Sequence, residues 1–328
     1  FQRSMMFRIA VADFSNTLPI MKVSDGLTWL AEAVLEEALR EAWRDLCERH
    51  GDPRYSLDDV TYTAGFGIIA YGKLGGLELS YGSDLDIVFL HDSRGKAQAT
   101  DCDKPLDKAL FFGRLVRRLV HLLTMQTGSG QLYEVDTRLR PDGHKGLLVT
   151  NTEAFERYQE ENAWTWEHQA LLRARPVAGS ATIAAEFERI RRETLVERVR
   201  REQLRDDVIS MREKMRRELD RSDSEHFDLK HGRGGIGDIE FLVQYLVLDN
   251  AEAHPDVIFY SDNIRQLDAL AEAGCIGTSI RDDLQDAYRD YRLKLHHLVL
   301  DNQPPLVRST DFAAQRQFVG ETWDAWLA

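Results

Sequence analysis

Residues 71–90 read YGKLGGLELSYGSDLDIVFL, and the expected architecture follows from this segment. A glycine-rich loop leads to a turn at Gly82-Ser83, and an apolar run, LDIVFL, then occupies 85–90. Short runs rich in β-branched and aromatic residues, bounded by glycine, are typical of buried strands. A similar run lies at 66–71, directly before the loop. The sequence therefore predicts two adjacent strands joined by the glycine-rich loop.

Two aspartates stand at the start of the second run. Asp84 and Asp86 are one residue apart, so on a strand they point to the same face while Leu85 enters the core. Neighbouring carboxylates repel each other, which raises the pKa of at least one, unless a divalent cation neutralises both. A lone Asp-x-Asp is usually a solvated strand end. The Gly-Ser turn before it and the apolar strand after it favour a site for Mg²⁺ or Mn²⁺.

A third strand is expected at 131–139, because charged residues alternate there with apolar ones. Asp136 would then complete a set of three carboxylates. Such a set suits a two-metal site with the metals roughly 4 Å apart, where one activates the nucleophile and the other neutralises the leaving phosphates. The implied reaction class is phosphoryl or nucleotidyl transfer, with Asp84, Asp86 and Asp136 as catalytic residues and metal ligands.

Further residues are candidates for binding a nucleotide cofactor or co-substrate. Gly82 lets backbone N–H groups approach a phosphate, and the hydroxyl of Ser83 can donate to one. Arg138 and Arg140 are expected on the face of the third carboxylate, where a guanidinium could contact a triphosphate. Lys73 is either a phosphate ligand or a solvated loop lysine. Two arginines that could also steer a triphosphate, although a structural role is commoner, are Arg173 and Arg175.

The composition is that of a globular protein. The chain has 328 residues, of which 43% are hydrophobic, and this length favours two domains. A formal net charge of −13 opposes extended contact with nucleic-acid phosphates. There is no run of about 18 uncharged apolar residues and no signal peptide, and the three cysteines lack disulfide or zinc spacing. We therefore expect a cytoplasmic protein with no nucleic-acid and no membrane partner; beginning at Phe1, it looks like part of a longer chain.

Beyond residue 152 almost every pattern is helical. The expected helices are 28–50 and 106–126 in the first part, and 181–219, 239–248, 263–273, 279–300 and 311–327 in the second. Gly274 stands where a helix C-cap belongs and Ser279 where an N-cap belongs. We predict an α+β architecture, with a mixed domain holding a small sheet at 1–185 and an all-α helical bundle at 186–328.

Two glycine motifs require separate interpretation. Gly72-Lys73 lacks the spacing of a P-loop, and residues 232–237 match Gly-x-Gly-x-x-Gly without a buried strand before them. Neither is therefore interpreted as a nucleotide-binding fingerprint. For Asp238 and Glu240, which follow the second motif, catalytic support and helix capping both remain open.

Two levels of resemblance to known families rest on these residues. Residues 82–86 (GSDLD), together with Asp136, resemble the signature of the DNA polymerase β-type nucleotidyltransferase superfamily. The longer segment 71–86 resembles the core of the glutamine synthetase adenylyltransferase family. The resemblance covers nearly the whole chain and includes LPIMKVSD (18–25), LYEVD (132–136), RLRP (138–141), AWTWEHQA (163–170), GGI (234–236), DIEF (238–241), LHHL (295–298) and WDAWL (323–327). Matches this extended are highly specific.

The resemblance implies a polymerase β-like nucleotidyltransferase domain followed by the helical bundle. Enzymes of that family have two homologous halves, and this chain resembles the C-terminal one. That half is implied to transfer AMP from ATP to a tyrosine of glutamine synthetase, releasing pyrophosphate and down-regulating the synthetase in nitrogen control. By the same carry-over, the three aspartates bind magnesium and the Gly-Ser turn holds the triphosphate.

Partners and alternatives follow from the same resemblance. The implied partners are glutamine synthetase as protein substrate, a PII-type nitrogen signal protein, and the N-terminal adenylyl-removing half of the full-length enzyme. The runner-up activity is phosphorolytic removal of AMP with the same metals. A third interpretation is a regulatory module that binds the PII-type protein without catalysis; the three intact aspartates argue against it.

Overall fold

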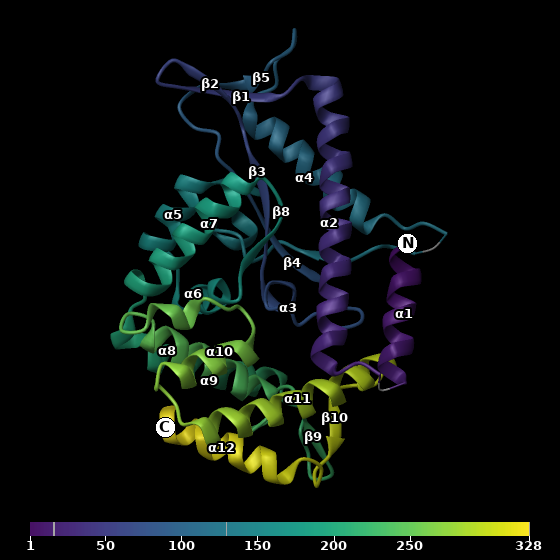
Figure 1. Cartoon of the computed structure of the whole chain (residues 1–328), viewed down its shortest axis with the longest axis vertical. Coiled ribbons are helices and arrows are strands. Elements are labelled where there is room, and N and C mark those ends of the chain that lie inside the picture. Colours follow the sequence, from purple (N-terminus) through teal and green to yellow (C-terminus); the bar gives the residue numbers. More distant parts are fainter. Residues whose placement is uncertain (16, 129, 328) are drawn as a thin grey trace. The chain divides into compact units, whose positions relative to one another are not determined.

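The computed structural model describes residues 1–15, 17–128 and 130–327, and its fold is α+β, as the sequence predicts (Figure 1). The chain divides into two compact units. Unit 1 comprises Phe1–Thr17, Val23–Ala163 and Arg173–Arg191; unit 2 comprises Leu18–Lys22, Trp164–Leu172 and Arg192–Ala328. The domain limits at 185 and 186 stay a prediction, and Ala328, the last residue of the second expected range, lies outside the described residues.

A mixed sheet forms the centre of unit 1. Its strands are β3 (Phe66–Ala70), β4 (Leu85–His91), β6 (Val135–Asp136), β7 (Val149–Asn151) and β8 (Arg175–Gly179). They follow the order β6-β4-β3-β8, and β7 also pairs with β4. The two strands predicted from 66–71 and 85–90 are confirmed as the antiparallel neighbours β3 and β4. β6 runs parallel to β4 and places Asp136 opposite Asp86.

The predicted strand at 131–139 is wrong in its extent, because only Val135–Asp136 joins the sheet. Before it, the backbone N–H groups of Leu132 and Tyr133 both donate to the carbonyl of Leu123 at the end of a helix. After it, the Asp136 carboxylate accepts the N–H of Arg138 at 2.8 Å, a local bond that replaces the next ladder bond. The alternation of faces assumed for the basic residues beyond Asp136 therefore ends there.

The helices of unit 1 cover this sheet. They are α1 (Gln2–Phe14), most of α2 (Ile20–His50), α3 (Gly72–Gly75), α4 (Lys108–Thr124), α5 (Thr152–Glu161) and most of α7 (Ala181–Glu193), with a 3-10 turn at Gly143–Lys145. In α4, Asp107 caps the first turn by accepting the N–H of Ala109. Phe112 of α4 is buried and stacks on Phe66 and on His91 of the sheet, so α4 closes the core over β3 and β4.

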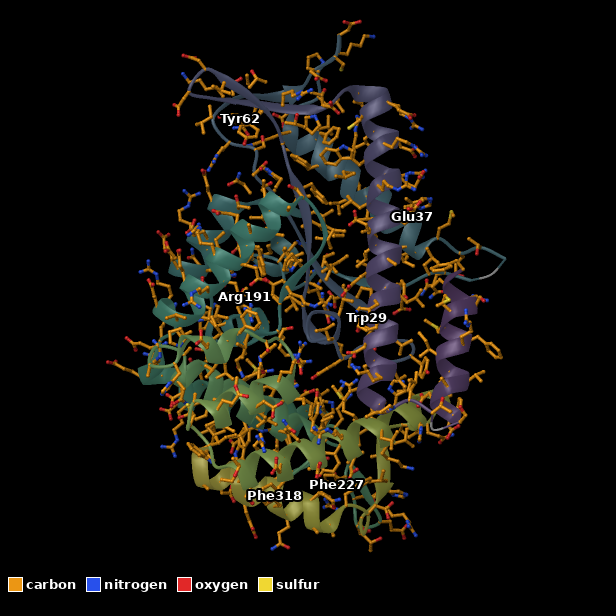
Figure 2. All side chains as sticks on the ribbon, in the orientation of Figure 1. Trp29, Glu37, Tyr62, Arg191, Phe227 and Phe318 are labelled. Atoms are coloured by element: carbon orange, nitrogen blue, oxygen red, sulfur yellow. The ribbon has the colours of Figure 1, made fainter. Side chains whose placement is uncertain are left out.

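A second sheet in unit 1 was not predicted. Its strands β1 (Pro53–Leu57), β2 (Val60–Thr63) and β5 (Lys96–Thr100) follow the order β2-β1-β5. β2 is exposed along its whole length, so it lacks the buried apolar alternation that marks a strand in sequence. Tyr62, labelled in Figure 2, instead stacks on Tyr55 of the neighbouring strand with ring centroids 5.4 Å apart.

Unit 2 is mainly helical. It contains α6 (Thr165–Leu172), a π-helical turn (Thr194–Arg198), α8 (Arg201–Leu219), α9 (Ile236–Asn250), a 3-10 turn (Pro255–Ile258), α10 (Asn263–Glu272), α11 (Thr278–Leu300) and α12 (Ala313–Leu327). Two short strands, β9 (His226–Asp228) and β10 (Leu306–Arg308), pair antiparallel. No helix among the described residues is long and apolar enough to cross a lipid bilayer.

Three details of the helical prediction differ in outcome. The helical stretch expected at 181–219 is confirmed for most of its length but is interrupted at Val199, which adopts extended backbone (ψ 129°) with its side chain buried and separates the π-helical turn from α8. The glycine expected at a helix C-terminus is confirmed, since Gly274 follows α10 with a φ of +75°. The N-cap expected at Ser279 is wrong, because α11 already begins at Thr278 with Gly277 as its N-cap.

His91 gives a prediction about stability and pH. It is buried in β4, its ring stacks on Phe112 at 4.5 Å between centroids, and its Nδ1 accepts the N–H of Ser93 at 3.1 Å. Burial lowers the pKa of His91 to about 4, with the charge of Lys108 as a smaller cause. An unfolded histidine has a pKa of about 6.5, so between the two values only the unfolded chain binds the proton, and stability falls as pH falls.

We therefore expect His91 to account for up to about 3 kcal/mol of unfolding free energy lost between pH 7 and pH 4. The measurement is urea unfolding across this pH range for the unaltered chain, for His91→Phe, and for His254→Gln as a control at an exposed histidine. The His91→Phe protein should lose less stability than the other two on acidification. Parallel losses in all three proteins would show that His91 is not held neutral.

Candidate metal and nucleotide site

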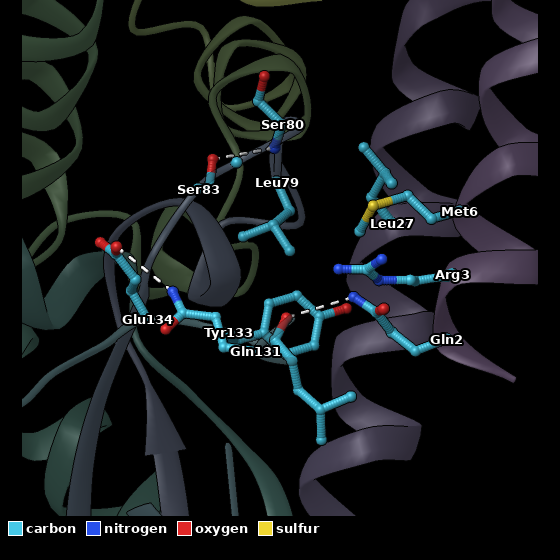
Figure 3. A pocket seen from close by; sticks show the side chains of 12 residues that line it. Gln2, Arg3, Met6, Leu27, Leu79, Ser80, Ser83, Gln131, Tyr133 and Glu134 are labelled. Atoms are coloured by element: carbon cyan, nitrogen blue, oxygen red, sulfur yellow. Dashed lines mark hydrogen bonds between the residues drawn. The ribbon is translucent and has the colours of Figure 1, made fainter. Parts of the chain in front are cut away.

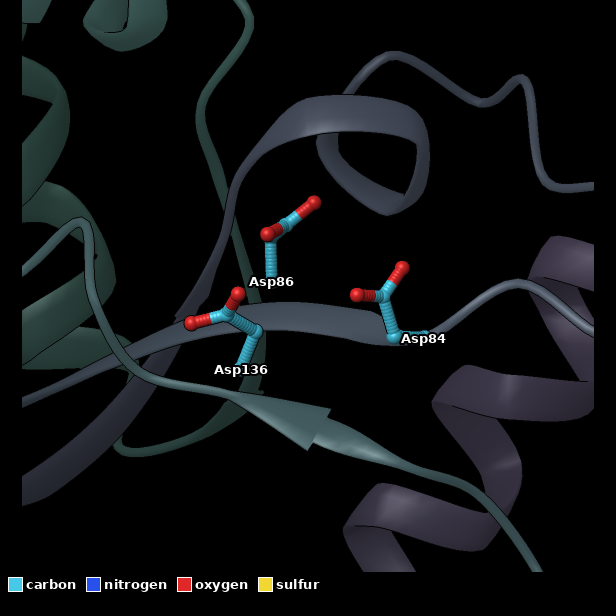
Figure 4. A group of neighbouring side chains, drawn as sticks. All are labelled: Asp84, Asp86 and Asp136. Atoms are coloured by element: carbon cyan, nitrogen blue, oxygen red, sulfur yellow. The ribbon is translucent and has the colours of Figure 1, made fainter.

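Three carboxylates converge at one end of the central sheet. Asp84 lies directly before β4, Asp86 is the second residue of β4, and Asp136 pairs with Asp86 from β6. One oxygen of each lies within 4.8 Å of the others, and Figure 4 shows the three side chains facing one another. The site therefore depends on the parallel register between β4 and β6.

The three carboxylates have different electrostatic surroundings. Burial, together with the negative charges of Asp84 and Asp136, raises the pKa of Asp86 to about 6. Asp136 is held by Arg138, whose Nε donates to Oδ2 at 2.6 Å and whose backbone N–H donates to Oδ1; this pairing keeps the pKa of Asp136 below its usual value. Asp86 is thus the member whose ionised form gains most from a nearby cation.

The residues present fit a divalent metal. Their ligand atoms are carboxylate oxygens, which Mg²⁺ and Mn²⁺ prefer. A cation would offset the repulsion and the burial that raise the pKa of Asp86. An acidic triad of this kind is typical of the metal sites of nucleotidyltransferases.

Gly72 belongs to this site, and the sequence analysis missed it. It opens α3 with a φ of +54°, and a Cβ built on it would lie 2.3 Å from Oδ2 of Asp86. The N–H of Tyr71 donates to the carbonyl of Asp86 at 2.9 Å, which fixes α3 against β4. Any larger residue here would displace the Asp86 carboxylate and strain a left-handed backbone, so the position favours glycine. The available signal was a glycine directly after the buried run of β3, but we considered it only as part of a P-loop.

Arg173 and Arg175, two of the four arginines considered for triphosphate steering, bind groups of the protein near α3. Arg175 donates from Nε to the carbonyl of Gly75 at 3.0 Å and from its terminal nitrogen to the carbonyl of Leu74. Arg173 forms a buried ion pair with Glu78. Arg175 therefore binds α3, the helix that begins at Gly72, and Arg173 binds the segment that follows α3.

The other residues expected to contact a nucleotide, Gly82, Ser83 and Lys73, differ in their surroundings. Gly82 is exposed with a φ of +66°, and a Cβ built on it would meet nothing within 4 Å. The Oγ of Ser83 accepts the N–H of Ser80 at 3.2 Å, so it stabilises this turn. Lys73 is exposed on α3, and its charge lowers the pKa of Asp86, which places it in the electrostatic reach of the cluster.

Arg138 and Arg140 have separate surroundings. Arg138 forms an ion pair with Asp136, a contact that the sequence analysis did not predict. Arg140 donates to the carbonyls of Thr137 at 2.7 Å and Gly146 at 3.3 Å, so its guanidinium closes the turn after β6. The face that the sequence analysis assigned to Arg140 is wrong, because the strand ends before it.

A pocket of about 280 Å³ lies next to the Gly82-Ser83 turn. Figure 3 shows that Gln2, Arg3 and Met6 reach into it from α1. Its lining further includes Leu27, Leu79, Ser80, Gln131, Leu132, Tyr133 and Glu134. The first helix of the chain is therefore in contact with the segment that precedes the carboxylates.

Asp238 lies in unit 2 and has a structural role there. It is buried, accepts from Nε of Arg212 at 2.7 Å and from Arg216 at 2.8 Å, and its second oxygen accepts the N–H of Gly234 at 2.7 Å. Of the two roles left open by the sequence, these bonds favour the fixing of the α9 N-terminus. Glu240 is half-buried in α9.

The glycine-rich motif before α9 is a packed turn. A Cβ at Gly234, which has a φ of +78°, would lie 2.2 Å from the carbonyl oxygen of Arg316. The glycine is therefore required by close packing against another segment of unit 2. A short strand, β9, does precede the motif, contrary to the sequence analysis, and the interpretation of residues 232–237 as no dinucleotide fingerprint stays a prediction.

Comparison with protein families gives two matches. Residues 1–190 match the family model described as glutamate-ammonia ligase adenylyltransferase. Residues 209–316 match the model described as GlnD PII-uridylyltransferase. The first match covers the three carboxylates and α3, and the second covers most of the helical unit.

Similar curated proteins carry the name bifunctional glutamine synthetase adenylyltransferase/adenylyl-removing enzyme. One from Thioalkalivibrio sulfidiphilus is 53% identical over 98% of this chain and 33% of its own length. One from Nitrosococcus oceani is 49% identical over 100% of this chain and 34% of its own length, and one from Hahella chejuensis is 46% identical with the same coverage. The chain thus spans about a third of the length of these relatives. The match of residues 1–190 establishes that this chain belongs to the glutamate-ammonia ligase adenylyltransferase family.

Proposed function

We propose that this chain transfers AMP from ATP to a tyrosine of glutamine synthetase, with release of pyrophosphate. The observation that carries the proposal is the convergence of three carboxylates beside α3 in a chain of this family. The adenylylating direction is supported by the resemblance of the chain to the C-terminal half of such enzymes, including WDAWL at 323–327. A cytoplasmic location, where ATP is available, is part of the proposal.

The proposed roles follow from the geometry. Asp84, Asp86 and Asp136 would hold one or two Mg²⁺ ions, with Mn²⁺ as a substitute. Bound magnesium neutralises phosphate charge and lowers the pKa of a phenol that starts near 10. The target tyrosine oxygen forms a bond to the α-phosphorus in line with the departing pyrophosphate. Asp136 accepts the phenolic proton in this proposal.

Residues around the carboxylates would bind the rest of ATP. The backbone at Gly82-Ser83 and the side chains of Lys73 and Arg138 are the proposed triphosphate contacts. Arg140 was a further candidate, but its donors are already used in the turn after β6. We propose that it supports Asp136 by fixing that turn.

Phosphorolytic removal of AMP remains the second candidate, because it would use the same carboxylates and because the relatives carry both activities in their name. Regulation by a PII-type protein, and assembly with the adenylyl-removing half of the longer enzymes, are proposed for the natural protein. A purely regulatory role is less favoured, since the carboxylate cluster is complete.

The first test is incubation of the chain with unmodified glutamine synthetase, Mg²⁺ and α-labelled ATP. We expect label on one tyrosine of the synthetase, detected by gel and peptide mass spectrometry. Asp84→Asn together with Asp86→Asn should lower the rate at least ~10²-fold, because charge stabilisation at the reacting phosphate is lost. The fold should persist, as judged by circular dichroism, since neither carboxylate supports the core.

Full activity of this double variant would refute the site. Incubation with AMP-modified synthetase and phosphate separates the two directions. Release of ADP without any labelling in the forward assay would assign the chain to the adenylyl-removing activity.

A second prediction concerns Gly72. Gly72→Ala should weaken Mn²⁺ binding at least ~10-fold, because the new Cβ displaces the carboxylate of Asp86. Gly82→Ala is the matched control, since it meets the same left-handed backbone cost of about 1 kcal/mol without any atom within 4 Å. Binding is measured by electron paramagnetic resonance without nucleotide. Equal losses in both variants would show that backbone strain, and not crowding of Asp86, limits the site.

A further inference from the structure

The first helix, α1, buries polar side chains on one face and exposes apolar side chains on the opposite face. On its inner face α1 buries Gln2, whose amide donates to the carbonyl of Leu132, and Asp13, whose carboxylate accepts from the hydroxyl of Tyr81 at 3.2 Å. Ile9 packs on the same side, since a Cβ on Gly26 of α2 would lie 3.3 Å from its Cδ1. Both ends of α1 are therefore fastened to unit 1.

The outer face of α1 is apolar. Phe7 is 70% exposed, Val11 52% and Phe14 59%, and their spacing of four and three residues places them in one stripe along the helix. Figure 1 shows α1 at the margin of unit 1. A contiguous apolar surface on a folded element marks an interaction site more often than isolated exposed residues do.

Arg8 borders this stripe and is exposed, while the single acidic residue of α1, Asp13, is buried on the other side. The charge at the stripe is therefore positive, although the chain as a whole has a net charge of −13. A surface of this kind fits an apolar partner surface bordered by carboxylates. It opposes pairing of two such faces, because their arginines would meet.

We propose that the outer face of α1 is covered, in the longer enzymes of this family, by polypeptide outside the third that this chain matches. The relatives have about two thirds of their length outside the matched region. Polypeptide in the same molecule reaches a high effective concentration at this face, so a small apolar stripe suffices for stable contact. The inference rests on family membership and does not depend on the direction of AMP transfer.

The test compares the accessibility of position 11 in the isolated chain with its accessibility in a full-length chimera. Val11→Cys is introduced into this chain alone and into a chimera in which the chain replaces the matched region of the full-length Nitrosococcus oceani relative, which aligns with 100% of it. The rate of modification by a small thiol reagent is followed by peptide mass spectrometry. Glu48→Cys, at an exposed position of α2, is the control.

We expect modification at position 11 to be at least ~10-fold slower in the chimera than in the chain alone, and modification at position 48 to be equal in both. Equal rates at position 11 would overturn the proposal. Slow modification of the isolated chain would also overturn it: a rate that falls with protein concentration would assign the face to a second copy, and a rate independent of concentration would assign it to another part of this chain.

A stability measurement provides an independent outcome. Phe7→Ser with Val11→Ser should leave the urea midpoint of the isolated chain unchanged, because these side chains contact water there. The same pair should lower the midpoint of the chimera. Unchanged midpoints in both proteins would contradict the coverage of α1.

Discussion

Asp86 is repelled by its two acidic neighbours, Asp84 and Asp136, and the chain around this end of the central sheet must hold the three carboxylates together against that repulsion. β6 pairs with β4 for only two residues, and this pairing sets Asp136 beside Asp86. A like-charge contact at a half-buried position persists only if the surrounding chain fixes both strands. Burial and the neighbouring charges raise the pKa of Asp86 to about 6, so the folded chain maintains an arrangement that a cation would relieve.

Several contacts from distant parts of the sequence maintain that arrangement. Arg138 neutralises Asp136 from the turn beyond β6. Arg175 holds the carbonyls at the end of α3, and α3 in turn places Gly72 against Asp86. The buried pair of Arg173 and Glu78 adds to this, because removing one member of such a pair leaves a buried charge at a cost of about 3–5 kcal/mol. Rigid support of this kind fixes reacting groups before substrate arrives.

The strands β3 and β4 and the pair Asp84 and Asp86 could be predicted because their signal is local. A buried strand has a period of two, and an aspartate on that period has a defined face. The end of β6 could not be predicted, because it depends on a bond between the Asp136 side chain and the N–H of Arg138, which competes with the ladder. The roles of Gly72 and Arg175 depend on contacts with residues far away in sequence, and no periodicity encodes those.

Unit 2 and α1 each contain a feature whose cause cannot be inferred from the local sequence pattern. In unit 2, the glycine-rich motif looks like a ligand loop in sequence, yet Gly234 is required because Arg316 packs against it. In α1, the sequence carries no regular amphipathic pattern, because the inner face uses Gln2 and Asp13 in specific hydrogen bonds while phenylalanine lies outside. Buried polar groups are tolerated when each finds a partner, so the inner face is explained by this chain alone. Phe7 and Val11 of the outer face are exposed in unit 1, and the proposed cover by polypeptide outside the matched region would account for their apolar character.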